Sequence, residues 1–227
     1  MENAAHDQTD ALAFDPAVRV FADAIVDTVA SYAASGRREV EHTVRTEAAR
    51  LANENAALAV DAASRRWLTL CFVLLAAYRT LRPLVGDGPT AVAVLQSSMT
   101  APFRAGIKAF IRDRFGISQD APQDAFERIA ETFQSRGEER FGRAFTFVSD
   151  GRDEERSFTN ITTCLFNDFF RANDANELTA VCCAMDYVWA EELAHPRYAV
   201  RFERPTTLAA GDDACRFRFF RRPKSTG

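Results

Sequence analysis

The stretch FTFVSDGRDEERSFTNITTC, residues 145–164, is where the hydrophobic pattern of the chain changes its period. Phe145 and Phe147 alternate with polar neighbours, a turn is predicted at Asp150-Gly151, and residues 156–164 are rich in Thr, Phe and Ile. Alternation with period two on both sides of a turn is typical of a β-hairpin. The stretch therefore predicts the first two strands of a sheet.

Before this stretch the apolar residues follow a helical period. From Arg37 to about Leu81 neither proline nor glycine interrupts the chain, so we expect one long helix or two abutting ones. Pro83 and the Gly-Asp-Gly-Pro sequence at residues 86–89 predict a break, and a further helical pattern over residues 90–115 contains Pro102, which can kink or divide it. Residues 1–140 are thus predicted to be a helical region.

After Cys164 the pattern predicts two helices, over residues 165–172 and 176–193, and then two more strands on either side of a turn at Gly211. Residues 141–227 therefore read as ββααββ, an antiparallel sheet with helices packed on it. We expect an α+β protein in which this second region carries the site, and in which both regions form one compact unit.

Composition limits the function. The chain has 227 residues, 47% of them hydrophobic, and a net charge of -4, which argues against nucleic-acid binding and favours a small-molecule ligand. Five cysteines, with no secretory signal in front of them, predict a cytoplasmic protein with free thiols. The apolar run at residues 68–78 is shorter than the roughly twenty residues of a membrane span, so we expect no membrane insertion.

Asp186 is the residue that conflicts most with its surroundings. At 100° per residue it falls inside the edge of an apolar helical arc, about 40° from Cys182. A carboxylate in that position must be paired, hydrogen-bonded or protonated. Asp186 is therefore a candidate general acid or base, or an anchor for a cationic nitrogen of a ligand; the alternative is a buried acid tied to a backbone amide or an arginine.

Three cysteines are candidates for chemistry. Cys164 ends a strand just before a helix, whose N-terminus can lower a thiol pKa, so it is the better nucleophile candidate. Cys183 lies one helical turn from Asp186, whose negative charge raises a thiol pKa, so nucleophilic use would need a cation nearby. Cys215 shares strand parity with Phe217 and should face the core. These cysteines with Asp186 could instead surround a zinc ion, although no Cys-x-x-Cys pair is present.

Further polar residues flank these candidates. Arg204 has the parity of Phe202, which points it inward, where it must meet a carboxylate either from Asp186 or from a ligand. Asn167 can orient a substrate or cap the helix after Cys164. Thr206 and Thr207 can offer hydroxyls to a substrate, although turn formation also explains them.

The order of these residues resembles the L-2-amino-thiazoline-4-carboxylic acid hydrolase family. The resemblance extends over roughly residues 68 to 220. Its motifs are Leu74–Leu81, Cys164 with the aromatic helix that follows it, Glu177–Thr179, Cys183–Asp186, Phe202–Leu208 and Gly211–Phe217. Arg216 and Pro205 depart from the pattern, which has an acidic and a hydroxyl residue there.

The resemblance implies a hydrolase that opens a small carboxylate-bearing ring at a cyclic C–N bond, without an organic cofactor. Arg204 would hold the substrate carboxylate and Asp186 would protonate the ring nitrogen, while Cys164 or a water attacks. Related members act in natural-product biosynthesis, so a heterocycle-forming or rearranging enzyme is an alternative. A second alternative is a non-catalytic ligand-binding module, because the closing hairpin also resembles the 4-vinyl reductase type of domain. A homodimer through the helix at residues 37–63 is also possible.

Overall fold

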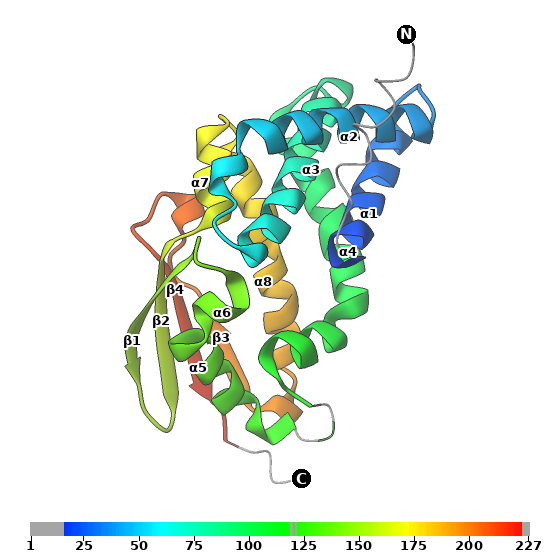
Figure 1. Cartoon of the computed structure of the whole chain (residues 1–227). Coiled ribbons are helices and arrows are strands. Elements are labelled where there is room, and N and C mark those ends of the chain that lie inside the picture. Colours follow the sequence, from blue (N-terminus) through cyan, green and yellow to red (C-terminus); the bar gives the residue numbers. More distant parts are fainter. Residues whose placement is uncertain (1–15, 119, 121, 224–227) are drawn as a thin grey trace.

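Helices form one layer of the fold and a four-stranded sheet the other (Figure 1). The structure, a computed structural model, describes residues 16–118, 120 and 122–223. Its α-helices are α1 Pro16–Tyr32, α2 Arg37–Glu54, α3 Ala62–Val85, α4 Gly88–Phe115, α5 Ala125–Ser135, α6 Gly137–Phe141, α7 Leu165–Ala172 and α8 Thr179–Leu193. Its strands are β1 Thr146–Arg152, β2 Arg156–Thr163, β3 Val200–Glu203 and β4 Cys215–Arg221. The predicted α+β class is confirmed.

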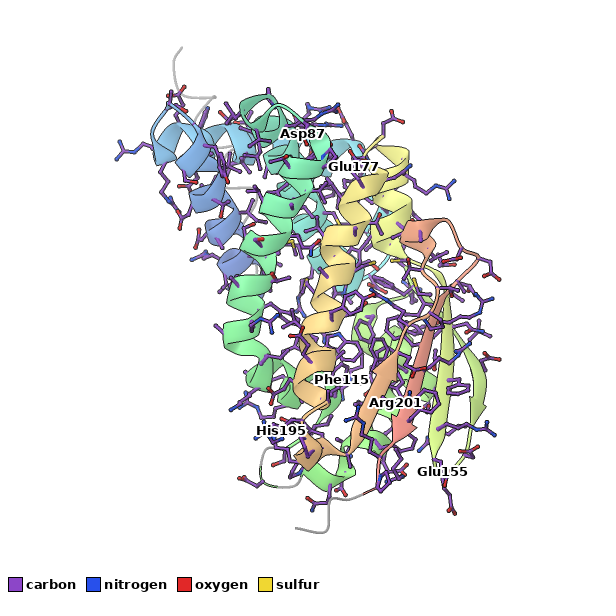
Figure 2. All side chains as sticks on the ribbon, turned by 180° about the vertical axis from the view of Figure 1, so that it is seen from behind. Asp87, Phe115, Glu155, Glu177, His195 and Arg201 are labelled. Carbon is purple, nitrogen blue, oxygen red and sulfur yellow. The ribbon has the colours of Figure 1, made fainter. Side chains whose placement is uncertain are left out.

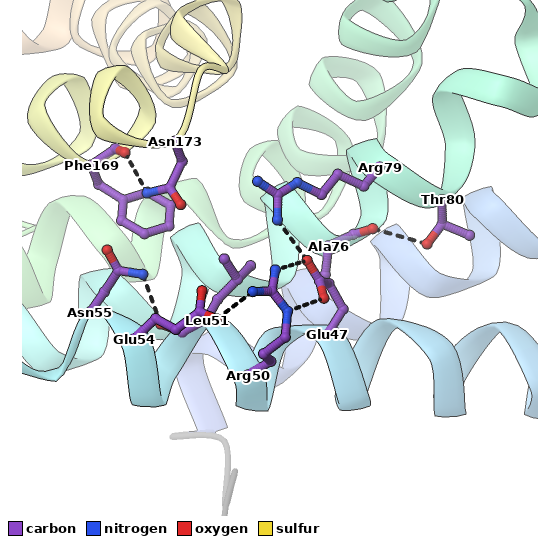
Figure 3. Close-up of polar contacts among 10 residues, drawn as sticks. All are labelled: Glu47, Arg50, Leu51, Glu54, Asn55, Ala76, Arg79, Thr80, Phe169 and Asn173. Carbon is purple, nitrogen blue, oxygen red and sulfur yellow. Dashed lines mark hydrogen bonds and ion pairs between the residues drawn. The ribbon is translucent and has the colours of Figure 1, made fainter.

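The uninterrupted pattern after Arg37 is two helices, and polar caps separate them. At the end of α2 the Asn55 side chain donates to the carbonyl oxygen of Leu51 at 2.9 Å (Figure 3). At the start of α3 the Asp61 carboxylate accepts the backbone N–H of Ser64 at 2.6 Å. Asparagine and aspartate satisfy helix ends without any glycine or proline, so these two residues mark the break.

A salt bridge and an apolar face join α2 to α3. Arg79 of α3 donates to Glu47 of α2 at 2.6 Å, as Figure 3 shows. The buried residues of α2 are Val40, Val44, Ala48 and Leu51. The apolar side of α2 therefore packs within the chain, and the homodimer through this helix stays a prediction.

The break expected at Pro83 and residues 86–89 is confirmed, since α3 ends at Val85 and α4 begins at Gly88, whereas Pro102 does not divide α4. Pro83 lies in the last turn of α3, which ends where Gly86 takes a φ of 92°. Proline has no backbone N–H to donate, and the helix ends within one turn of it. Pro102 lies inside α4 between the buried residues Met99 and Phe103, whose packing holds the helix continuous.

The core helix of the bundle is α3. It is long and apolar enough to cross a membrane by composition, but 61% of its most apolar window is buried inside the structure. It contacts α1, α2, α4 and α7. The helix is longer than the apolar run at residues 68–78, so its burial, rather than its length, identifies it as a core helix.

The sheet is antiparallel, as predicted, and its strands lie in the order β1-β2-β4-β3. The position of the hairpin turn was wrong, since Asp150 and Gly151 belong to β1. The turn lies at residues 153–155, where the Asp153 carboxylate accepts the backbone N–H groups of Glu155 and Arg156. Gly151, with a φ of 106°, instead lies at a register irregularity of β1.

Aromatic side chains fill the space between the sheet and the helices. Phe133 of α5 lies 5.1 Å from Phe219 of β4, and Trp189 of α8 lies 4.7 Å from Phe202 of β3, between ring centroids. Figure 2 shows side chains crowded between α8 and the sheet. Phe115, labelled there at the end of α4, lies 5.6 Å from Trp189 between ring centroids. The site lies in this aromatic layer.

Candidate active site

A cavity of about 90 Å³ lies inside the aromatic layer. This is several times the volume that one water molecule needs. Eight phenylalanines, two tryptophans and four cysteines line it, and its two charged lining residues among those described are Asp186 and Arg204. The cavity can therefore hold a small, largely apolar ligand and offers it one charged pair.

Both regions of the chain build the cavity. Trp67 comes from α3, Phe103 from α4 and Phe133 from α5, whereas Phe217 comes from β4. Sequence reasoning missed the helical contribution. Phe103 and Phe110, seven residues apart, lie on one face of α4, and that spacing was the available signal.

Asp186 lies on α8 and faces Arg204, which follows the last residue of β3. Its Oδ2 atom accepts a hydrogen bond from Nη1 of Arg204 at 2.5 Å, and its Oδ1 atom accepts one from Nε1 of Trp189 at 3.0 Å. Burial raises the pKa of the Asp186 carboxyl group, although Arg204 and Trp189 oppose the shift. The predicted paired acid on the apolar arc is present, and it lines the cavity.

Arg204 points inward, as the strand parity predicted, and only 2% of its side chain is exposed. Its Nη2 atom donates to the carbonyl oxygen of Cys183 at 3.3 Å, and its guanidinium carbon lies 4.7 Å from the centre of the Tyr187 ring. Its Nε atom is buried and has no hydrogen-bond partner among the described residues. Arg204 therefore keeps one donor without a partner in the described chain.

Cys164 is the N-cap residue of α7 and lines the cavity. The expected lowering of its thiol pKa is wrong. Burial raises that pKa, and the backbone N–H groups of Asn167 and Phe166, which act in the opposite direction, do not overcome it. The helix N-terminus is correctly placed, but the thiol is too well shielded from water to ionise easily.

Cys183 and Cys215 also line the cavity, and Cys215 faces the core as predicted. Burial, and then the charge of Asp186, raise the pKa of Cys183 to about 12, while Arg204 opposes the shift. All five cysteines are free thiols. In the part of the chain that the structure describes, no group of three or more Cys, His, Asp or Glu residues is placed to hold a metal ion, so the zinc alternative has no support.

The remaining candidates lie outside the cavity lining. Asn167 is buried inside α7, whose N-cap is the preceding Cys164, so it does not cap that helix. Thr206 donates its hydroxyl to the carbonyl oxygen of Ala214 at 2.8 Å, and the Thr207 hydroxyl accepts the backbone N–H of Ala210 at 3.2 Å. Both threonines are therefore used in building the loop before β4.

Fold and site together define an α+β protein with an aromatic cavity and one acid–arginine pair on its wall. The chain belongs to the L-2-amino-thiazoline-4-carboxylic acid hydrolase family, whose model matches residues 64–219, about two thirds of the chain. The match includes every residue that lines the cavity. No curated protein and no solved structure matches the chain.

Proposed function

We propose that this chain is a hydrolase that opens a small, thiazoline-like ring bearing a carboxylate, inside the aromatic cavity. Membership of a hydrolase family supports the reaction class. The observation that carries the proposal is the Asp186–Arg204 pair, which is the charged part of an otherwise apolar and thiol-lined cavity.

Charge balance gives the two residues different roles. The substrate carboxylate binds the guanidinium of Arg204, whose Nε atom has no hydrogen-bond partner among the described residues. It then adds a second negative charge beside the carboxylate of Asp186, whose pKa burial already raises. A like charge raises a carboxyl pKa further, so Asp186 takes up a proton when the substrate binds. The protonated acid is then a donor for the ring nitrogen.

The proposed reaction needs only water as a second reactant. Asp186 transfers its proton to the ring nitrogen, and water adds to the adjacent electrophilic carbon. One proton of that water returns to Asp186, and the C=N bond has become a C–N single bond. Asp186 then gives this proton to the nitrogen while the hydroxyl of the adduct loses its own proton to solvent water. The C–N bond breaks with its electron pair staying on the nitrogen, which leaves as a neutral amine, and the solvent proton restores the acid form of Asp186. A C=O bond replaces the C=N bond, and no electron is lost or gained.

Water is favoured over a cysteine as the nucleophile. Burial raises the thiol pKa of Cys164 and also that of Cys183, the latter to about 12. Among described residues, no histidine lines the cavity to take a proton from either thiol. Both therefore serve better as small apolar lining groups.

The test is turnover of a panel of thiazoline-4-carboxylates in ¹⁸O-labelled water, followed by mass spectrometry. We expect one labelled oxygen in each opened product, and a loss of at least about 100-fold in kcat for Asp186→Asn. The control is Asp168→Asn, which changes an exposed acid of α7 and should leave turnover unchanged.

Two results would favour the alternatives. A product of rearrangement without labelled oxygen would favour a heterocycle-forming or rearranging enzyme. Tight binding of the carboxylates without any conversion would favour a ligand-binding module.

A further inference from the structure

Arg114 lies against the wall of the cavity formed by the helices. It belongs to the last turn of α4, and its guanidinium carbon lies over the rings of Trp67, Phe110 and Phe141, at 5.5, 6.0 and 5.4 Å from their centres. All three rings line the cavity. The rings of Trp67, Phe110 and Phe141 therefore lie between the Arg114 guanidinium and the cavity.

Arg114 differs from Arg204 in having no carboxylate. Among the described residues, neither Arg114 nor its neighbour Arg140 forms an ion pair, although the adjacent Arg112 pairs with Asp113 at 2.7 Å. Arg114 donates to the carbonyl oxygen of Arg140, a neutral acceptor. The Nε atom of Arg140 is itself buried without a hydrogen-bond partner among those residues.

Positive charge accumulates at this place. Burial lowers the pKa of Arg114, and the charges of Arg66 and Arg140 lower it further. Contacts with ring faces compensate a guanidinium only in part. A partly buried guanidinium normally meets a carboxylate or a phosphate in a charge-assisted hydrogen bond. Among the described residues no carboxylate pairs with Arg114, and the exposed Glu139, which pairs with Arg136, interacts with Arg140 only through its charge.

Neither arginine is among the residues that line the cavity. We propose that Arg114 and Arg140 form an anion subsite behind the rings of the Trp67 wall, and that it binds an acidic group that the ligand extends past these rings. Asp186 and Arg204 lie on a different wall, which comes from α8 and the segment after β3. The ligand would thus be a ring carboxylate with a second acid, a carboxylate or a phosphate, on a substituent of the ring. The inference rests on the proposed function only in taking this cavity as the ligand site.

Isothermal titration calorimetry with aromatic thiazole-4-carboxylates tests the subsite, because these rings bind without being opened. The ligands are matched in length and carry at position 2 a substituent that ends in a carboxylate, a phosphate or an uncharged amide. For the wild-type chain we expect at least about 10-fold tighter binding of one acid-ended ligand than of the amide, which corresponds to about 1.4 kcal/mol. The better of the two acids identifies the natural group.

Variants locate the effect. Arg114→Gln should abolish the preference for the acid, Arg114→Lys should keep part of it, and Arg112→Gln, an exposed residue of the same turn, should leave it unchanged. If Arg114→Gln does not fold, the preference for the acid-ended ligand over the amide is measured instead in Arg140→Gln and Arg114→Lys, where we expect it to be reduced.

Equal binding of acid and amide by the wild-type chain would overturn the proposal, and so would a preference that persists in both Arg114→Gln and Arg140→Gln, or an absence of binding by any ligand. Failure of the proposed hydrolysis is a separate result, because the binding experiment requires no turnover.

Discussion

The guanidinium of Arg204 and the carboxylate of Asp186 form an ion pair at 2.5 Å in which the cation is the more deeply buried partner, 2% exposed against 29%. Removing only the Asp186 carboxylate leaves the Arg204 guanidinium as an unpaired, buried charge. Removing both side chains leaves no buried charge. The two residues should therefore be strongly coupled in stability.

A double-mutant cycle measures this coupling. We expect Asp186→Leu to lower the free energy of unfolding by about 3 kcal/mol, because it strands the Arg204 guanidinium. Adding Arg204→Met should restore most of that loss. Urea unfolding followed by circular dichroism provides the four values, and additive losses in the double variant would contradict the expected coupling.

The raised pKa of Asp186 predicts how stability depends on pH. The folded chain binds this proton more tightly than the unfolded chain, whose carboxyl group titrates near 3.8. The contribution of Asp186 to stability is therefore most favourable at low pH, and it declines as the pH rises from about 4 through the folded pKa. Over that pH interval, the free energy of unfolding of the wild-type chain should fall relative to that of Asp186→Asn. Urea titrations at a series of pH values measure it; a constant difference, or one of opposite slope, would disagree.

The thiols that line the cavity should react slowly. Burial raises the pKa of Cys164 and of Cys183, so the thiolate fraction at pH 8 is far below that of a free cysteine. We expect an aromatic disulfide reagent to modify few thiols of the folded chain within minutes and all five after unfolding in urea. Cys164→Ala should retain turnover if water is the nucleophile. Its complete loss, with the fold intact, would assign the attack to Cys164.

Two glycines should respond to alanine in opposite directions. A Cβ atom at Gly137 would lie 2.5 Å from the ring of Phe147, which lines the cavity. Gly137→Ala should therefore destabilise the chain by about 1–3 kcal/mol and weaken ligand binding. Gly106, exposed within α4, has no atom within 4 Å of such a Cβ, so Gly106→Ala should stabilise it by about 0.5–1 kcal/mol. Thermal unfolding of both variants tests the pair, and a shift in the same direction would refute the steric argument.

Local patterns in the sequence predicted the orientation of side chains where that orientation depends only on the period of the helix or strand that carries them. The period of α8 placed Asp186 at an apolar face, strand parity turned Arg204 inward, and α7 has the predicted bounds. The break between α2 and α3 was harder to predict. Asn55 ends α2 and Asp61 begins α3, and neither end has a proline or glycine. Whether a polar side chain caps a helix depends on which backbone group it reaches. The amino-acid composition of the segment does not show this.

Features that arise from packing between distant segments could not be predicted from one sequence. Trp67 and Phe217 line the same cavity although 150 positions separate them in the chain. The thiol of Cys164 shows the same limit, because its helix N-terminus is visible in the sequence whereas the burial that dominates its pKa comes from all its neighbours.

A lining made of rings also bears on how this enzyme family can diversify. Aromatic side chains exclude water and define shape, but they impose few hydrogen-bonding requirements on a guest. Exchanging single phenylalanines such as Phe103 or Phe145 for smaller residues would remodel the room around a substituent while the aspartate and arginine stay in place. Under the proposed function, new substrates are then reachable by steps that leave the proposed reacting groups unchanged.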